Sequence, residues 1–370
     1  MVKISLVEMH GHSEVLTSFW YALKEFELSI FVYNSSLEIN LPESTIHFSS
    51  TNQSAEDYLL NNKDHIENSD WIIFITIEKY FKFFARQTWK SKTVLVIYDG
   101  NYWLNYYRNV TFQSPKDIFR FIKAFFYRDQ YYKREIINRM NYITFQNDTI
   151  KDFFIDSCSI SKNKVFPCLP FYLPLEKSKF ITQRLTNTIN ITIPGAIRKD
   201  TRDFDVVFRA FKQSEKYFNK NVNLTLLGKP LGLYGKKILK KFCKLRNDRV
   251  KVNYYDNYVT NEVYDNVMKE SSLIILPTRK TMKYYNCIEL PGLTKMSNIL
   301  NDVIRFDLPI ILPNSYYLTP DIEHFVYRYT NSFDLSKKLI DLINGNATFQ
   351  YKSIPIKPVV GYDHFFKENK

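Results

Sequence analysis

Short apolar runs alternate with helix-length amphipathic stretches along most of the chain. In the first half, near-continuous apolar blocks predict strands over Val2–Val7, Leu28–Tyr33, Thr45–Phe48, Trp71–Thr76, Thr93–Tyr98, Tyr142–Phe145 and Lys164–Phe166. Helices are predicted between them, near Ser13–Lys24, Ala55–Ile66, Ile77–Arg86, Pro115–Arg139 and Thr149–Asp156. Strands that are apolar on both faces and alternate with helices indicate a parallel sheet covered by helices on both sides.

A second alternating series fills the C-terminal half. It follows Pro167, Pro170, Pro174 and the polar run Glu176–Asn190, which together predict an interdomain linker. Its predicted strands are Ile189–Pro194, Val222–Leu227, Val250–Asn253, Leu273–Leu276 and Pro309–Leu312. Its predicted helices are Asp203–Tyr217, Tyr234–Lys244, Thr260–Lys269, Lys295–Phe306 and Phe333–Ile343.

The two series predict two domains of one class. A chain of 370 residues suits two domains of about 150–200 residues each. We predict an α/β fold with two Rossmann-like domains that face each other across a cleft. The first spans residues 1–172 and is completed by residues 351–370, and the second spans residues 185–350. Sheets of this kind bind ligands at the carboxyl ends of their strands.

The net charge of +13 predicts an anionic partner: a phosphate-bearing substrate, anionic lipid or nucleic acid. The cations are spread along the chain and no nucleic-acid motif is present, so we expect no nucleic-acid partner. Four cysteines form no CxxC pair and no cluster with histidine, which predicts reduced thiols, a cytoplasmic protein and no metal site. The first residues resemble a strand rather than a signal peptide, and no apolar run reaches the roughly 18 residues of a membrane span.

The segment Ile118–Met140 interleaves basic and aromatic residues. It carries six cations, Arg120, Lys123, Arg128, Lys133, Arg134 and Arg139, among seven Phe and Tyr side chains. A helix of this composition can lie on an anionic membrane surface, which would place the protein peripherally at the inner face of the cell membrane. Alternatively, the helix packs its aromatic side chains inward and leaves its cations in solvent. The sequence leaves both possibilities open.

A loop that begins at Gly292 is the first candidate binding site. It carries Thr294, Lys295 and Ser297 and leads into a short amphipathic helix and an apolar strand. Strand–loop–helix units aim unpaired backbone N–H groups and the positive end of the helix dipole at one spot, which suits a diphosphate. The hydroxyls and the ammonium would then neutralise that diphosphate without a metal ion. An ordinary helix cap is the alternative.

A second cluster follows the strand Ile189–Pro194. The turn at Gly195 is followed by Arg198, Lys199 and Arg202, and Lys229 follows Gly228 after the next strand. Cations at the carboxyl ends of strands suit a pyrophosphate. The alternative is that they are solvated loop residues, and that Arg202, which precedes a helix N-cap at Asp203, points outward.

The C-terminal half resembles the donor domain of retaining glycosyltransferases of the GT-B fold, in particular the family 4-like group. The resemblance runs from Ile191 to about Asn344 and rests on Ile191–Phe211, Leu224–Lys229, Val250–Pro277 and Val303–Leu312. The family's Glu-x7-Glu motif falls on Thr294 and Asp302, so the first acid is replaced and the second is shortened. Asp307 stands where the family usually has glycine.

The resemblance implies roles for further residues. Asp302 would accept hydrogen bonds from the donor ribose, Tyr254 would lie near the nucleobase, and Glu289 would contact hydroxyls of the donor sugar. In the first domain, the loop His10–Ser13 would face the reaction centre, where His12 would orient the acceptor or contact the transferred sugar. A purely structural role is the alternative for each, and Asp99–Asn101 is a weaker candidate.

From the resemblance we predict an enzyme, a hexosyltransferase-like and retaining glycosyltransferase. Its donor would be a nucleoside-diphosphate sugar, with Lys295, Arg198 and His12 as catalytic residues and no metal or other cofactor. Its acceptor would be a hydroxyl of a glycan or lipid-linked glycan, in the synthesis of bacterial surface polysaccharide or glycoconjugate. The alternative is a non-catalytic α/β protein of the same fold that binds a nucleotide or a glycan.

Overall fold

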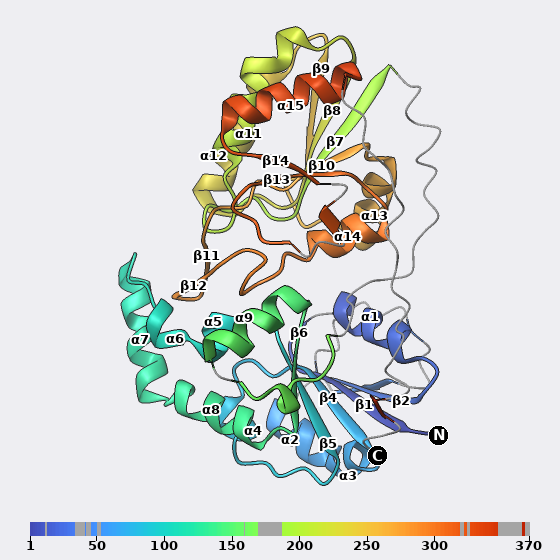
Figure 1. Cartoon of the computed structure of the whole chain (residues 1–370), viewed down its shortest axis with the longest axis vertical. Coiled ribbons are helices and arrows are strands. Elements are labelled where there is room, and N and C mark those ends of the chain that lie inside the picture. The colour runs from blue at the N-terminus through green and yellow to red at the C-terminus, as the bar shows by residue number, and fades with distance from the viewer. Residues whose placement is uncertain are drawn as a thin grey trace. The chain divides into compact units, whose positions relative to one another are not determined.

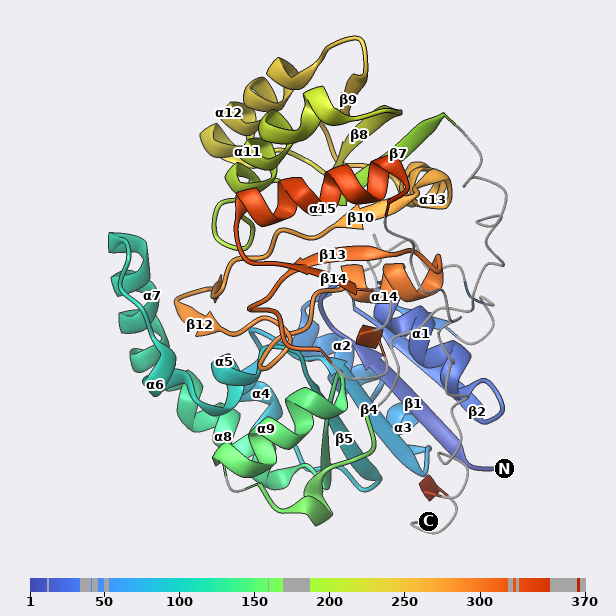
Figure 2. The ribbon, with the colours of Figure 1, turned by 45° about the horizontal axis from the view of Figure 1, so that its top comes forward.

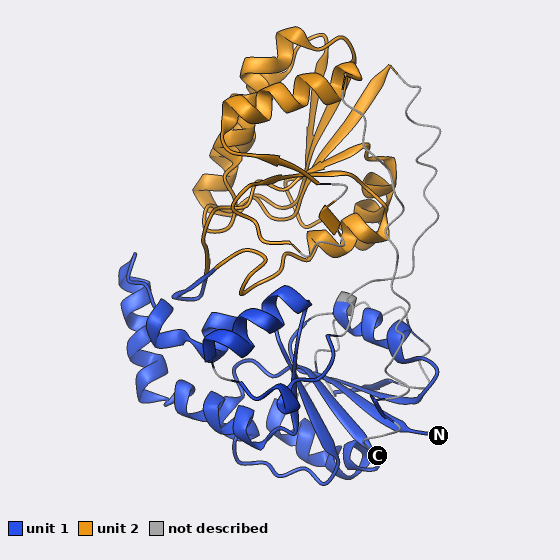
Figure 3. Cartoon of the chain, viewed as in Figure 1, with its two compact units in different colours: residues 1–173, 284–289, 356–370 blue, residues 174–283, 290–355 orange. Residues whose placement is uncertain are grey.

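The computed structural model describes residues 1–11, 13–33, 41, 46–49, 53–158, 160–168, 187–318, 322–323, 326–346 and 365–366. The chain divides into two compact units (Figure 3). Unit 1 comprises Met1–Leu173, Tyr284–Glu289 and Ile356–Lys370, and unit 2 comprises Pro174–Lys283 and Leu290–Pro355. Each unit is a parallel α/β layer structure (Figure 1), as the alternating pattern predicts.

Unit 1 contains a six-stranded parallel sheet in the order β3-β2-β1-β4-β5-β6. Its strands are β1 (Lys3–Glu8), β2 (Glu27–Val32), β3 (Ile46–Phe48), β4 (Trp71–Thr76), β5 (Lys92–Ile97) and β6 (Tyr142–Phe145). Its helices are α1 (Ser13–Leu23), α2 (Ala55–Asn61), α3 (Lys63–Glu67), α4 (Phe81–Phe84), α5 (Gly100–Leu104), α6 (Tyr106–Asn109), α7 (Pro115–Phe126), α8 (Asp129–Arg139) and α9 (Asp148–Cys158), followed by the 3-10 turn η2 (Lys162–Lys164).

Unit 2 contains a second six-stranded parallel sheet, in the order β14-β13-β10-β7-β8-β9. Its strands are β7 (Thr188–Pro194), β8 (Asn221–Leu227), β9 (Val250–Tyr254), β10 (Leu273–Ile275), β13 (Ile310–Pro313) and β14 (Val326–Tyr329). Its helices are α11 (Phe204–Ser214), α12 (Gly232–Phe242), α13 (Asn261–Glu270), α14 (Ile299–Arg305) and α15 (Ser332–Asn344), with 3-10 turns η3 (Glu215–Tyr217) and η4 (Cys243–Leu245).

Both sheets reverse their strand order at the first strand of the unit. In unit 2 the chain runs outward from β7 through β8 to β9, then crosses to β10 on the other side of β7 and continues to β13 and β14. In unit 1 the same reversal occurs between β1 and β4. Loops that leave in opposite directions at such a switch point open a crevice at the carboxyl edge of the sheet, which is where doubly wound folds bind ligands.

Buried aromatic side chains tie the C-terminal tail to unit 1. Trp71 is fully buried, and its ring lies 5.0 Å from that of Phe366 and 6.1 Å from that of Phe166. Phe366 is also fully buried and packs edge-on against Phe26. The described part of the tail, residues 365–366, therefore belongs to the core of the first domain, and the rest of residues 351–370 lies outside the described residues.

Several predicted elements differ from the structure. The stretch Ala55–Ile66 is two helices, α2 and α3, and the helix predicted from Lys295 begins at Ile299. The helical stretch Pro115–Arg139 is two helices, α7 and α8, because Arg128 adopts a left-handed conformation with φ of 56° between them. The stretch Ile77–Arg86 keeps only the single turn α4, because Lys79 also has a positive φ, of 74°. The predicted strand Lys164–Phe166 reduces to one bridge, between Ile143 and Val165.

The insertion between β10 and the loop at Gly292 forms a small hairpin. Its strands are β11 (Met282–Tyr284) and β12 (Cys287–Glu289), which pair only with each other. Residues 284–289 pack within unit 1, although the chain on both sides belongs to unit 2. Nothing in the hydrophobic pattern predicts this exchange, since the segment has no helical or strand periodicity of its own.

Candidate functional site

The carboxyl edge of the unit 2 sheet is built around two glycines. Gly195 ends β7 with φ of 90°, and its N–H donates to the carbonyl of Leu227 at 2.7 Å. A side chain at Gly228 would collide with the backbone of Gly195, and one at Gly195 would collide with the guanidinium of Arg202. Both turns therefore need glycine, and they bring the ends of β7 and β8 together at the switch point.

Arg202 lies beneath this turn and is only 8% exposed. Its guanidinium donates a hydrogen bond to the carbonyl of Pro194, the last residue of β7. No carboxylate among the described residues pairs with it. Burial lowers its pKa to about 10, and nearby Arg198 acts in the same direction. The alternative that Arg202 points outward is therefore wrong, because the loop after β7 turns this side chain inward.

The loop after β7 is also tied to the end of β10. Arg202 forms an isolated antiparallel β-bridge with Thr278. On either side of it, the N–H of Asp203 donates to the carbonyl of Pro277 at 2.7 Å. The N–H of Arg279 donates to the carbonyl of Thr201 at 3.1 Å. Asp203 caps α11 by accepting from the N–H of Val206, as predicted. The two strand ends that flank the switch point thus hold a buried cation in a fixed position.

The other predicted residues of this edge are exposed. Arg198 lies on the loop after β7 and makes a weak ion pair with Asp200 at 3.9 Å. Lys229 follows β8 with its side chain in solvent, while its carbonyl accepts from the N–H of Ile197. Tyr254 ends β9 with 36% of its surface exposed, and the guanidinium of Arg246 lies 5.7 Å from its ring centre. Their ligand contacts remain predictions.

The loop at Gly292 folds back on itself before α14. The buried hydroxyl of Thr294 accepts from the N–H of Leu290 at 2.7 Å, and the N–H of Gly292 donates to the carbonyl of Lys295 at 2.7 Å. The N–H of Ser297 donates to the hydroxyl of Tyr316 at 3.0 Å, just past β13. The loop therefore lies at the carboxyl end of β13, on the same edge of the sheet as Gly195.

Asp302, in the position of the second acid of the family motif, lies on α14. Its carboxylate accepts from the hydroxyl of Tyr264 on α13 at 2.7 Å. The neighbouring pair Arg305 and Asp265 joins the same two helices through two hydrogen bonds of 2.7 and 3.1 Å. The structure thus gives Asp302 a contact between helices, and its predicted bond to a ribose remains a prediction.

Glu289 lies in the part of the hairpin that belongs to unit 1. It is fully buried, and its two carboxylate oxygens accept from the N–H groups of Asn101 at 3.2 Å and Tyr102 at 2.8 Å. The side-chain amide of Asn101 returns a bond to the carbonyl of Ile288. This carboxylate therefore caps the start of α5, and its predicted contact with a donor sugar remains a prediction.

His12 lies outside the described residues, and Glu8 holds the backbone of the loop that leads to it. Glu8, fully buried at the end of β1, accepts from the N–H groups of His10 at 2.7 Å and Gly11 at 2.9 Å. The hydroxyl of Thr76 on β4 donates to its other oxygen at 2.6 Å. In the sequence, Glu8 is visible only as an acid that ends an apolar run. That single acid at the end of a strand was the available signal that Glu8 holds the following loop.

A buried lysine in unit 1 is the second feature that the sequence did not reveal. The ammonium of Lys133 on α8 donates to the carbonyl of Tyr102 at 2.9 Å and lies 3.0 Å from the centre of the Tyr102 ring. Three more rings, those of Phe81, Trp103 and Tyr106, lie within 6 Å. Burial lowers the pKa of Lys133 to about 7, although neighbouring carboxylates oppose the change.

Two properties of the described residues bear on the class of protein. No helix among them is long and apolar enough to cross a bilayer. No three His, Cys, Asp or Glu side chains among them gather in a way that could hold a metal ion.

Comparison with solved structures identifies the fold. The chain aligns over its full length with the N-terminal domain of Candida albicans trehalose-6-phosphate phosphatase, at 12% identity, a TM-score of 0.57 and 92% coverage of that chain. It aligns equally fully with Anabaena HepE in complex with UDP, at 11% identity, a TM-score of 0.56 and 95% coverage of that chain. The Methanocaldococcus jannaschii UDP-GlcNAc 2-epimerase bound to UDP-GlcNAc and UDP gives 12% identity, a TM-score of 0.52 and 99% coverage.

These structures share the GT-B fold, and HepE and the epimerase were solved with UDP or a UDP-sugar. The predicted fold class, two parallel α/β domains of this type, is confirmed. At 9–12% identity among the chains compared, the likeness establishes the fold alone. No family model and no curated protein sequence matches the chain.

Proposed function

We propose that the protein is a glycosyltransferase that binds a nucleoside-diphosphate sugar at the carboxyl edge of the unit 2 sheet. The observation that carries this proposal is the buried, carboxylate-free guanidinium of Arg202 at the switch point of that sheet. GT-B neighbours that were solved with UDP or a UDP-sugar support the choice of ligand.

A diphosphate is the ligand that best suits a buried cation of this kind. Burying a charge without a partner is costly, and the cost falls when an anion completes the site. Arg202 is also held by a backbone carbonyl and by the ends of two strands, so it does not need to be ordered when the ligand binds. The donor diphosphate would supply the missing negative charge, with Arg198 and Lys229 at the exposed rim of the site.

In the proposed reaction, an acceptor hydroxyl attacks the anomeric carbon of the donor sugar. The new C–O bond forms as the bond between that carbon and the diphosphate oxygen breaks, and the electron pair leaves with the nucleoside diphosphate. Arg202, Arg198 and Lys295 stabilise this developing charge, with Thr294 and Ser297 beside Lys295. The acceptor proton passes to the leaving phosphate or to solvent. The resemblance to retaining enzymes leads us to propose retention at the anomeric carbon and protein cations in place of a metal ion.

The remaining roles follow the same resemblance. We assign the ribose to Asp302, the base to Tyr254 and the acceptor to His12. Glu289 receives no ligand here, because its buried carboxylate caps α5. The pathway we propose is the synthesis of a bacterial surface polysaccharide or glycoconjugate, in the cytoplasm.

An exposed face of α7 supports a peripheral membrane location. Ile118, Phe119, Ile122, Phe125 and Phe126 follow the spacing of one helical face, and each is 45–76% exposed. Figures 1 and 2 show α7 at the outer margin of unit 1, with no other element on its outer side. Lys116, Arg120 and Lys123 flank this face on the same helix. Apolar side chains that enter the headgroup region beside cations are typical of helices that bind anionic bilayers, and such binding would bring the protein to a lipid-linked acceptor.

Calorimetry with UDP, GDP, CDP and dTDP tests the donor site. One nucleotide should bind clearly best, and Arg202→Met should weaken it by about 1.5–3 kcal/mol, the range for hydrogen bonds to charged groups. Arg209→Met, on the exposed face of α11, is the matched control and should bind as the wild type does. Equal binding by both variants would remove Arg202 from the site, and unfolding curves would show whether the Arg202 variant is folded.

Product analysis separates the transferase from its alternatives. With the best donor, a transferase slowly releases free sugar and nucleoside diphosphate when water replaces the acceptor, and the coupling of the anomeric proton reports retention or inversion. A non-catalytic binding protein releases neither product. The replacement of the first family acid by Thr294, which is engaged in its own turn, is the observation that favours this alternative.

A further inference from the structure

Unit 1 contains a hollow among its helices. Its volume is about 610 Å³, within the range of small-molecule sites. It is bounded by the end of α5 and by α6, by the outer face of α8, by the C-terminal end of α9, and by η2. Its lining consists of Trp103, Leu104, Asn105, Tyr106, Tyr107, Arg108, Gln130, Arg134, Ile137, Asn138, Ser157, Cys158, Ile160, Ser161 and Lys164.

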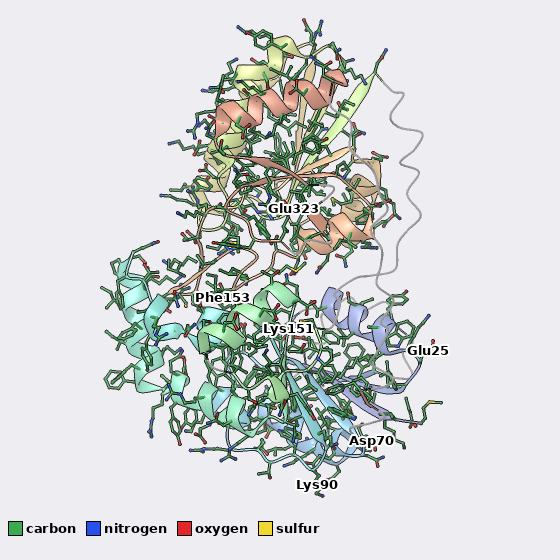
Figure 4. All side chains as sticks on the ribbon, in the orientation of Figure 1. Glu25, Asp70, Lys90, Lys151, Phe153 and Glu323 are labelled. Carbon is green, nitrogen blue, oxygen red and sulfur yellow. The ribbon has the colours of Figure 1, made fainter. Side chains whose placement is uncertain are left out.

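On its α9 side, the hollow lies away from the edge where a Rossmann-like sheet binds its ligands. Helix α9 leaves that edge at Asp148, directly after β6, and it reaches the hollow only at Ser157 and Cys158. Nine residues of helix span about 14 Å at 1.5 Å per residue. Figure 4 labels Lys151 and Phe153 on the first turns of α9, which precede the part of the helix that lines the hollow. The α9 side of the hollow therefore lies away from that edge, while its other side begins nearer to it, at Trp103 of α5, the helix that follows β5.

The lining is strongly one-sided in charge. It contains three cations, Arg108, Arg134 and Lys164, and no carboxylate. The guanidinium groups of Arg108 and Arg134 form no ion pair or hydrogen bond with another described residue. The ammonium of Lys164 donates only to the carbonyl of Asn138, at 3.0 Å, and burial lowers its pKa. The acid closest in sequence to Arg134, Glu135, lies outside the lining and faces Arg139 at 4.0 Å.

Neutral groups in the hollow add hydrogen-bonding and stacking capacity. The side-chain amide nitrogen of Gln130 is buried and has no acceptor among the described residues. Asn105, Ser157 and Ser161 also line the space. Its aromatic residues are Trp103, Tyr106 and Tyr107, of which Tyr107 is the exposed one. Aromatic faces that pack against C–H groups, beside amides and hydroxyls, suit a sugar or polyol.

We propose that this hollow binds a phosphate-bearing sugar or polyol, with the phosphate held by Arg108, Arg134 and Lys164. A phosphate carries up to two negative charges and accepts bidentate hydrogen bonds from guanidinium groups, which suits three cations better than a single carboxylate does. The volume exceeds what a phosphate alone would fill and leaves room for the attached sugar or polyol. The same chemistry occurs in a soluble sugar phosphate and in the headgroup of an anionic phospholipid.

Cys158 provides a local measure of occupancy. It lines the hollow and is partly exposed. Cys243 in unit 2 is also a free and partly exposed thiol, so it serves as the internal control. We suggest measuring the alkylation of each cysteine by peptide mass spectrometry, with the full chain and no nucleotide present. Glucose 1-phosphate and glycerol 1-phosphate are the soluble phosphates, glucose and glucuronate are the comparison compounds, and vesicles of phosphatidylglycerol in phosphatidylcholine carry the headgroup.

We expect a phosphate compound to slow the alkylation of Cys158 and to leave Cys243 unchanged. Arg134→Gln and Arg108→Gln should each raise the concentration required by about tenfold or more, as for a lost charge-assisted hydrogen bond. Arg139→Gln, at the end of the same helix α8, should leave it unchanged. Protection by vesicles alone, lost in Arg134→Gln, would identify a lipid headgroup as the source, and protection by soluble compounds would identify a sugar phosphate.

Three results would overturn the proposal. They are the absence of protection by any phosphate compound, equal protection by glucuronate, and protection that persists in both arginine variants. Because the assay contains no nucleotide and reads a thiol in unit 1, its failure leaves the donor site of unit 2 untouched. Conversely, a failure of donor binding leaves this result intact.

Discussion

Lys133 of unit 1 is surrounded by the rings of Phe81, Tyr102, Trp103 and Tyr106, which we call the aromatic cage. Because this lysine is buried, it should make the free energy of unfolding depend on pH, and one substitution tests its contribution. Lys133 is fully buried, and its ammonium has no carboxylate partner among the described residues. Burial lowers its pKa to about 7 from 10.5. We predict that Lys133→Met, which keeps the length of the side chain and removes the charge, stabilises unit 1 at neutral pH and loses this advantage as the pH rises.

The sign follows from the direction of the pKa change. Between pH 7 and 10.5 the unfolded chain binds a proton at Lys133 and the folded chain does not, so raising the pH stabilises the wild type. Each pKa unit corresponds to about 1.4 kcal/mol, which gives a full range of about 5 kcal/mol. Cation–π contact opposes the effect by stabilising the charged form, typically by about 2 kcal/mol for a desolvated site. The cost of desolvating the ammonium outweighs this contact, so a net effect of the same sign remains.

Tryptophan fluorescence can follow this effect in unit 1 alone. All four tryptophans, Trp20, Trp71, Trp89 and Trp103, lie within residues 1–173. Urea unfolding monitored by their emission at pH 7.0, 8.0 and 9.5 gives the free energy of unfolding of the wild type and of Lys133→Met. The advantage of the variant should shrink by about 3 kcal/mol across this range, less any cation–π contribution.

Lys82→Met is the matched control, because Lys82 is exposed on α4 beside Phe81, a ring of the cage. Its difference from the wild type should not change with pH. A difference between Lys133→Met and the wild type that is equally independent of pH would refute the reasoning. It would mean that contact with the aromatic rings outweighs desolvation and keeps Lys133 charged in the folded protein.

Three further predictions concern the other sites. Gly195→Ala should lower both the free energy of unfolding and the nucleotide affinity, because the added side chain would displace Arg202. The strain of positive φ alone costs of order 1–3 kcal/mol. Gly345→Ala, with φ of 81° and open space around it, is the control for that strain in thermal unfolding and calorimetry. Replacing Phe119 and Phe126 with serine should abolish sedimentation with phosphatidylglycerol vesicles and leave nucleotide binding unchanged, and unaltered sedimentation would exclude α7 as the membrane contact. Chelation with EDTA should leave sugar transfer or donor hydrolysis intact, and activity restored only by Mg²⁺ or Mn²⁺ would contradict a site built from protein cations.

The fold was predictable because buried strands are recognisable from their own residues. Most strands of both sheets contain a run of buried residues, and in β4, Trp71–Thr76, every residue is buried. Such runs need no information from distant parts of the chain. The short strand β3 is an exception, since only Ile46 is partly buried there. Gly195 was predictable for a similar reason, since a glycine between a buried strand and a capped helix indicates a turn that requires positive φ. The edge strand β14 is only partly buried and was missed.

Individual side chains were harder to predict because their surroundings come from distant segments. Arg202 resembles a solvated residue next to a helix cap, and only the paired ends of β7 and β10 turn it inward. Glu289 caps α5 across 188 positions of sequence. The hairpin that carries it belongs by sequence to the second domain. The periodicity of a sequence predicts only which face of its own helix or strand a residue occupies. Arg202 and Glu289 make their contacts with other elements, so periodicity could not predict them.

The same argument applies to the positive charge. In the sequence, the excess of cations looks evenly spread. This spread weakened the hypothesis of a nucleic-acid partner but did not indicate which other anion the protein binds. The fold brings Arg108, Arg134 and Lys164 to one hollow, although they lie 26 and 30 positions apart along the chain. It also buries Arg202 alone at a sheet edge and leaves the cations of α7 beside an apolar face. Because these places are separate, we propose a different anion for each: an organic phosphate, a diphosphate and a bilayer surface. A protein that bound nucleic acid through its net charge would instead lose affinity in similar steps at every cation that was removed.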